Sequence, residues 1–105
     1  YNDAAEKVDE VAERILQLGS NPESRFSAYL QSAEIKEVGV VSCSKEAVDL
    51  LLDYYKTLIA RERRIIEVAS DAHDDTTVSL VSDFLKEQEK TVWMLVAVSS
   101  QSCAE

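Results

Sequence analysis

The sequence predicts an all-α fold, and three observations support that prediction. Among 105 residues there are only two glycines and one proline, so few residues interrupt regular structure. Between these breakers, apolar residues recur at the three- and four-residue spacing of amphipathic helices. The length suits one hydrophobic core, so residues 1–105 are expected to form a single domain. Three long helices and one short helix then form the expected bundle.

The first predicted helix runs from the start of the chain to about Leu18. One arc of its helical wheel is apolar and holds Ala4, Ala5, Val8, Val11, Ala12, Ile15, Leu16 and Leu18. Gly19 is suited to a left-handed C-terminal cap, and Ser20-Asn21-Pro22 stops the helix. Tyr1 already has the character of a helix interior, so we expect a fragment or a processed chain.

The remaining elements follow in order. A short helix is expected from about Glu23 to Ala33, and residues 38–41 (Val-Gly-Val-Val) are interpreted as a packed loop. Ser44 is the predicted N-cap of a long helix that ends near Ala72. The last helix is predicted from about Thr76 to Val98, capped by Asp74-Asp75 and followed by a frayed tail from residue 99 to 105.

Glu62 is the unusual residue of the long helix, because it falls in the middle of an apolar arc. A carboxyl group on such a face needs a partner or a proton, so we expect a buried hydrogen bond to another helix.

The formal net charge is −9, which disfavours non-specific DNA binding by this segment and attracts cations. The basic run 61–64 (Arg-Glu-Arg-Arg) is spread around its helix. No apolar run approaches a membrane span, and no secretion signal is visible. Cys43 and Cys103 lack metal-binding spacing. A cytoplasmic protein with reduced thiols is expected.

Asp9 and Glu13 are the first candidate site residues, since they lie one helical turn apart beside the apolar arc. Two such carboxylates can bind one hard cation. They are also typical of a solvated helix face, where ion pairs with residues near Arg14 are ordinary. Spacing alone leaves both interpretations open, and Glu10 and Arg14 are expected to form salt bridges.

A second cluster consists of Asp71, Asp74 and Asp75, which precede the last helix. Around a three-fold axis these charges would concentrate cations, whereas in one chain they simply cap a helix. Cys43 lies before the predicted N-cap and beside Lys45, a setting that lowers a thiol pKa. It is a candidate redox thiol, intersubunit disulfide or soft ligand to a metal or haem, with an inert exposed cysteine as the alternative.

Three segments together resemble the Dps family, starvation-induced mini-ferritins that assemble as hollow dodecamers. They are residues 9–15 (Asp-Glu-Val-Ala-Glu-Arg-Ile), the short helix around residues 25–30, and Asp74-Asp75-Thr76-Thr77 followed by residues 89–95 (Glu-Lys-Thr-Val-Trp-Met-Leu). The resemblance covers essentially the whole chain. It implies a ferritin-like four-helix bundle with a short crossover helix, here missing its first helix and the start of the second.

The resemblance also implies a function. Asp9 and Glu13 would bind iron in a di-iron centre at a subunit interface, facing histidines from the neighbouring chain. The subunit would be a ferroxidase that oxidises Fe(II), preferably with hydrogen peroxide, stores the iron and protects against oxidative stress. Asp71, Asp74 and Asp75 would line an iron-entry pore. Trp93 would pack near the iron centre, and His73 stands where the family usually has a cap glycine.

Two rival functions remain open at this point. One is a DNA-coating oligomer, which the acidic composition of this segment does not support. The other is a truncated helical domain that pairs with another chain and has no catalytic activity.

Overall fold

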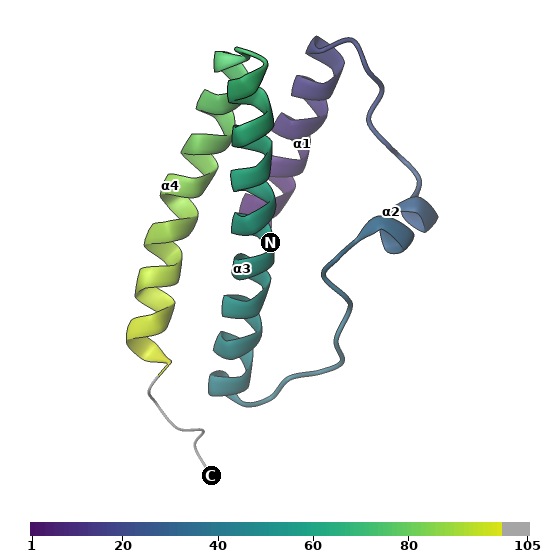
Figure 1. The fold of residues 1–105 in the computed structure, drawn as a ribbon. Helices are drawn as coiled ribbons and strands as arrows, with labels where there is room; N and C mark the ends of the chain where they lie inside the picture. The colour runs from purple at the N-terminus through teal and green to yellow at the C-terminus, as the bar shows by residue number, and fades with distance from the viewer. Residues whose placement is uncertain (100–105) are drawn as a thin grey trace. The chain divides into compact units, whose positions relative to one another are not determined.

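The computed structural model describes residues 1–99, and within them the chain forms four α-helices and no strand (Figure 1). The helices are α1 (Asn2–Gln17), α2 (Phe26–Ser32), α3 (Ser44–Asp71) and α4 (Asp75–Val98). They belong to two compact units, Tyr1–Ala33 and the part of the chain from Glu34 onward. The all-α prediction is confirmed. Most of the predicted tail, residues 100–105, lies outside the described residues.

The end of α1 is set by Gly19, as predicted. Gly19 has φ 89°, a conformation that only glycine adopts without strain. Its amide donates to the Leu16 carbonyl at 3.0 Å, and the Ser20 amide donates to the Ile15 carbonyl at 3.1 Å. These two hydrogen bonds form a Schellman motif, which satisfies carbonyls that the end of the helix would otherwise leave unbonded.

The helix α2 begins three residues later than predicted, at Phe26 rather than Glu23. The cause is the Glu23 side chain, whose Oε1 accepts hydrogen bonds from the amides of Ser24 at 3.2 Å and Arg25 at 3.1 Å. The Arg25 Nε donates to the same oxygen at 2.8 Å, and the Tyr29 hydroxyl donates to the Glu23 carbonyl at 2.7 Å. The turn so formed replaces the first predicted helical turn.

In the second unit, α3 and α4 pack against each other as a hairpin (Figure 1). The joint between them is short because α3 also ends in a Schellman motif. His73, with φ 59°, donates its amide to the Ser70 carbonyl at 3.0 Å, and the Asp74 amide donates to the Ala69 carbonyl at 2.8 Å. His73 therefore occupies the left-handed position that usually favours glycine, and it acts as a helix cap.

The start of α3 differs slightly from the prediction. Its N-cap is Cys43, and Ser44 is the first helical residue, with no side-chain cap hydrogen bond at this end. Because the Cys43 backbone is extended (φ −96°, ψ 129°), the preceding segment enters the helix as an extended chain.

The connector from Glu34 to α3 has no helix or strand and runs back along α3. Glu34 forms an ion pair with Arg61, which lies 17 residues into that helix or about 25 Å from its start. The ten-residue connector reaches about 35 Å when fully extended, which is enough to span this distance. Val40 is 100% exposed and Val38 is 53% exposed, so the packed-loop prediction was wrong about packing.

Few side chains are buried among the described residues. The buried apolar side chains are Ala69, Val81 and Phe84, and the buried polar side chains are Glu62, Thr77 and Gln88. Glu62 is buried as predicted, with 8% exposure. In contrast, Trp93 is 69% exposed and Met94 48% exposed, so neither is a core residue. None of the helices in residues 1–99 is long and apolar enough to cross a membrane.

Candidate functional site

Asp9 and Glu13 lie one turn apart on α1, so their Cα atoms are separated by about 6 Å along the helix axis. Both side chains are exposed. Within residues 1–99 the structure shows no ion pair to Asp9, Glu10 or Glu13. The salt bridges expected of Glu10 and Arg14 stay a prediction. Arg14 Nη1 donates a hydrogen bond to Oε1 of Gln17 at 3.1 Å.

The apolar arc beside these carboxylates is present but uncovered. None of the residues of α1 is buried, and Val8 and Leu16 are 68% and 57% exposed. The two carboxylates thus stand at the edge of an exposed apolar stripe, where a neighbouring surface would lie against both. Carboxylate oxygens bind Fe(II), and exposed carboxylates are accessible to a cation from solvent.

Asp9 and Glu13 are two candidate carboxylates without a third candidate ligand beside them in the described residues. Among the described residues, no group of three or more histidine, cysteine, aspartate or glutamate side chains comes close enough to hold a metal ion. The chain has one histidine, His73, and it caps α3. A complete centre here would need further ligands that the described part of α1 does not provide.

The three aspartates at the α3–α4 joint have different environments. Asp71 ends α3 and Asp75 begins α4, and both side chains are exposed. Asp74 is the N-cap of α4: its Oδ1 accepts from the Thr77 amide at 3.2 Å and its Oδ2 accepts from the Thr77 hydroxyl at 2.5 Å. The capping interpretation is confirmed for Asp74. The pore interpretation stays a prediction, for which Asp71 and Asp75 have the accessible carboxylates.

Cys43 is disulfide-bonded in the structure. The reduced thiol expected from the sequence is therefore not what the structure shows, and a disulfide sulfur has no thiolate to offer to a metal or haem. The other cysteine, Cys103, lies outside the described residues.

Comparison with known proteins identifies the family. The ferritin-like domain family matches residues 1–101. The chain is 30% identical over 101 residues to DNA protection during starvation protein 2 of Bacillus anthracis. The matched segment covers 96% of this chain and 69% of the Bacillus protein. The chain belongs to the Dps family of ferritin-like proteins.

Two further relatives agree with this assignment. The DNA protection during starvation protein of Porphyromonas gingivalis is 50% identical over 101 residues, and this Dps-family chain spans 64% of its length. The crystal structure of the Dps protein from Vibrio cholerae O1, described as a member of a superfamily of ferritin-like diiron-carboxylate proteins, matches with a TM-score of 0.89 and 42% identity. That match covers 92% of this chain and 61% of the Vibrio chain, and it confirms the predicted ferritin-like fold.

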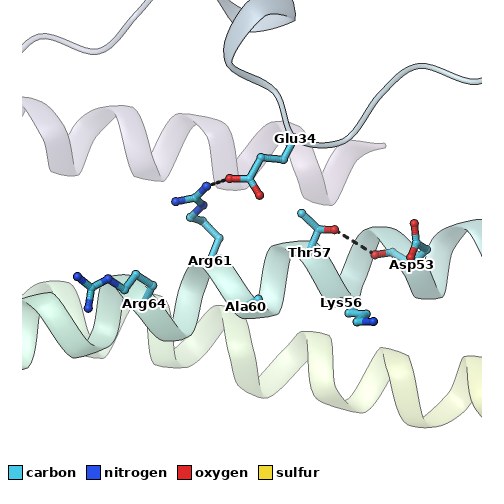
Figure 2. A pocket seen from close by; sticks show the side chains of 7 residues that line it. All are labelled: Glu34, Asp53, Lys56, Thr57, Ala60, Arg61 and Arg64. Carbon is cyan, nitrogen blue, oxygen red and sulfur yellow. Dashed lines mark hydrogen bonds and ion pairs between the residues drawn. The ribbon is translucent and has the colours of Figure 1, made fainter.

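One feature of this Dps-family chain was not predicted from its sequence, a groove along α3 and the connector before it. The residues that line it are Glu34, Asp53, Lys56, Thr57, Ala60, Arg61 and Arg64 (Figure 2). The available signal was the spacing of Arg61 and Arg64, since positions i and i+3 share one helix face. No pattern in the sequence indicated that Glu34 lines the same groove.

Proposed function

We propose that this chain is part of a ferroxidase and iron-storage subunit of a Dps-like cage, with Asp9 and Glu13 as iron ligands. The observation that carries the proposal is the state of these two carboxylates: exposed, one turn apart, and engaged in no ion pair within residues 1–99. Family membership adds to it, since the Vibrio cholerae Dps protein is described as related to diiron-carboxylate proteins.

In the proposed reaction Fe(II) is the substrate. Each of two Fe(II) ions gives up one electron, and one hydrogen peroxide molecule accepts both electrons and two protons to form two molecules of water. The carboxylates hold the cations and favour the higher charge of Fe(III) over Fe(II). Because α1 supplies only carboxylates, the imidazole ligands that the family resemblance implies are proposed to face them from another chain.

The assembly proposed for this subunit is a cytoplasmic homododecamer. The overall charge of −9 attracts Fe(II) toward such a cage. Asp71 and Asp75, both exposed at the α3–α4 joint, are the proposed pore carboxylates. Asp74 would contribute its charge there while it continues to cap α4.

The test compares the double variant Asp9→Asn/Glu13→Gln with a control that loses the same charge from the same helix, Glu6→Gln/Glu10→Gln. Anaerobic Fe(II) binding is measured by calorimetry, and Fe(III) formation after addition of peroxide is measured by absorbance. We expect the first variant to lose binding and oxidation and the control to keep both. Equal binding and oxidation in the wild type and the first variant would contradict the proposal and support a helical domain without iron chemistry.

A second candidate function, DNA coating, is favoured by the names of the relatives, which are called DNA protection during starvation proteins. The net charge of this segment opposes it. A gel shift at low salt separates the two functions. A shift that persists in Asp9→Asn/Glu13→Gln would support a DNA-binding role independent of the carboxylates.

A further inference from the structure

The groove on α3 is lined by three cationic side chains, Lys56, Arg61 and Arg64, and by two carboxylates, Glu34 and Asp53. It is open to solvent and has a volume of about 440 Å³, comparable in size to small-molecule sites of about 300–1,000 Å³. The side chain of Arg61 points toward Glu34, which reaches the groove from the connector, and Arg64 lines the groove one turn further along α3 (Figure 2). The whole groove belongs to the unit that begins at Glu34.

Each of the three cations is accessible to a ligand. Lys56 is exposed and forms no ion pair with any part of the chain that the structure describes. Arg64 is 62% exposed, and its Nη1 pairs with Oε1 of Glu67 at 3.1 Å. Arg61 is also 62% exposed and pairs with Glu34. Exposed ion pairs of this kind are weak, so a more highly charged anion can compete with them.

The Glu34–Arg61 pair shows that the groove already accepts an anionic group. A carboxylate from the chain's own connector lies against the Arg61 guanidinium (Figure 2). The hydroxyl of Thr57 is a further donor on the same face, and it makes only a long hydrogen bond of 3.4 Å to the Asp53 carbonyl. Two guanidinium groups, one ammonium group and one hydroxyl group are donors that suit the oxygens of a phosphate group.

We propose that this groove binds a phosphate-bearing small molecule, with Arg61 and Arg64 as the principal ligands of the phosphate and with Glu34 as its intramolecular competitor. A volume of about 440 Å³ exceeds what one phosphate ion needs, so a phosphomonoester fits as well as inorganic phosphate. The ligand displaces Glu34 from Arg61 and thereby releases the start of the connector. This site shares no residue with the candidate iron site, and the proposal does not depend on iron chemistry.

The first test uses two neighbouring arginines. Arg64 lines the groove, whereas Arg63 is equally exposed and does not. Binding of inorganic phosphate and of a nucleoside monophosphate is measured by calorimetry at low ionic strength, because exposed charges are screened by salt. Arg64→Gln is expected to weaken binding by about threefold, and Arg61→Gln/Arg64→Gln by about tenfold. Arg63→Gln is expected to leave it unchanged.

The second test predicts a change of opposite sign. Glu34→Gln removes the competitor and should tighten phosphate binding by about threefold. Glu37→Gln changes the net charge equally on the same connector, outside the groove, and should leave binding unchanged.

Binding of either probe with this pattern supports the site, and the ratio of the two affinities shows whether free phosphate or a phosphomonoester is preferred. Equal effects of Arg64→Gln and Arg63→Gln, equal effects of Glu34→Gln and Glu37→Gln, or binding of neither probe would overturn the proposal. All the substituted side chains are exposed, and circular dichroism confirms that each variant keeps its helices.

Discussion

The carboxylate of Asp74 accepts two hydrogen bonds from Thr77, one from its backbone amide at 3.2 Å and one from its hydroxyl at 2.5 Å. The Asp74 amide at the same time donates to the Ala69 carbonyl at 2.8 Å, which closes α3. One residue thus ends one helix through its backbone and begins the next through its side chain. The direction of the α3–α4 hairpin depends on this joint.

Replacing Asp74 with Ala should destabilise the hairpin by about 1–2 kcal/mol, because the first turn of α4 loses its N-cap. Asp75→Ala is the matched control: its side chain is exposed at the first position of α4 and contributes only about 0.5 kcal/mol through the helix dipole. Urea unfolding followed by circular dichroism measures both. Equal losses in the two variants would show that charge, and not the cap, stabilises this joint.

His73→Gly should stabilise the same joint. His73 has φ 59°, where a side chain costs about 1–2 kcal/mol, and part of the gain is offset by the greater freedom of glycine in the unfolded chain. The expected net gain is about 0.5–1 kcal/mol. His73→Ala keeps the Cβ atom and should give no gain. Thermal unfolding of the two variants distinguishes relief of backbone strain from simple loss of the imidazole.

Gln88 is a buried polar residue of α4. It is 5% exposed, and its Oε1 makes no hydrogen bond within the described part of the chain. Gln88→Met has nearly the same length and no amide group to bury, so it should stabilise the fold by about 1 kcal/mol. Denaturant unfolding is the measurement, with the exposed Glu87→Gln as control. A loss of stability would reveal that the amide has a bonding role.

The turn before α2 should respond to acid. The pKa of Glu23 lies below its ordinary value of 4.5, because Arg25 donates a side-chain hydrogen bond to its carboxylate and the Arg25 and Ser24 amides add backbone hydrogen bonds. A lowered folded-state pKa means that the turn gains stability above pH 4.5 and loses it as the pH falls through the lowered value.

NMR titration of the Ser24 and Arg25 amides checks this prediction. Their chemical shifts should change together, with a midpoint below 4.5, and Glu23→Gln should abolish the change. A midpoint at or above the ordinary value would mean that the hydrogen bonds do not favour the ionised carboxylate.

The sequence predicted the elements whose signals are local. Gly19 predicted the end of α1 and Asp74 predicted the start of α4, and the structure confirms both. Each of these signals depends only on hydrogen bonds between residues that are close in sequence. The predicted start of α2 was wrong because the Glu23 side chain accepts hydrogen bonds from the next two backbone amides. Helix propensity alone does not indicate this alternative to a helical turn. Burial was overestimated for Val38 and Val40, since burial depends on which surfaces meet.

For the candidate sites too, local features were predicted and long-range features were not. The spacing of Asp9 and Glu13 predicted that they lie on one side of one helix, and both are in α1. The groove was missed because Glu34 is distant in sequence from Arg61, and only the extended connector brings the two together. The basic run 61–64 is spread around α3 as predicted, with Glu62 buried and Arg61 and Arg64 in the groove.

Iron binding by Asp9 and Glu13 is tested most directly with an iron-soaked crystal examined at the iron absorption edge, where anomalous density marks iron alone. We expect an anomalous peak within coordination distance of both carboxylates, and its loss in Asp9→Asn/Glu13→Gln. Iron peaks elsewhere in the crystal, with no peak at these two side chains, would contradict it.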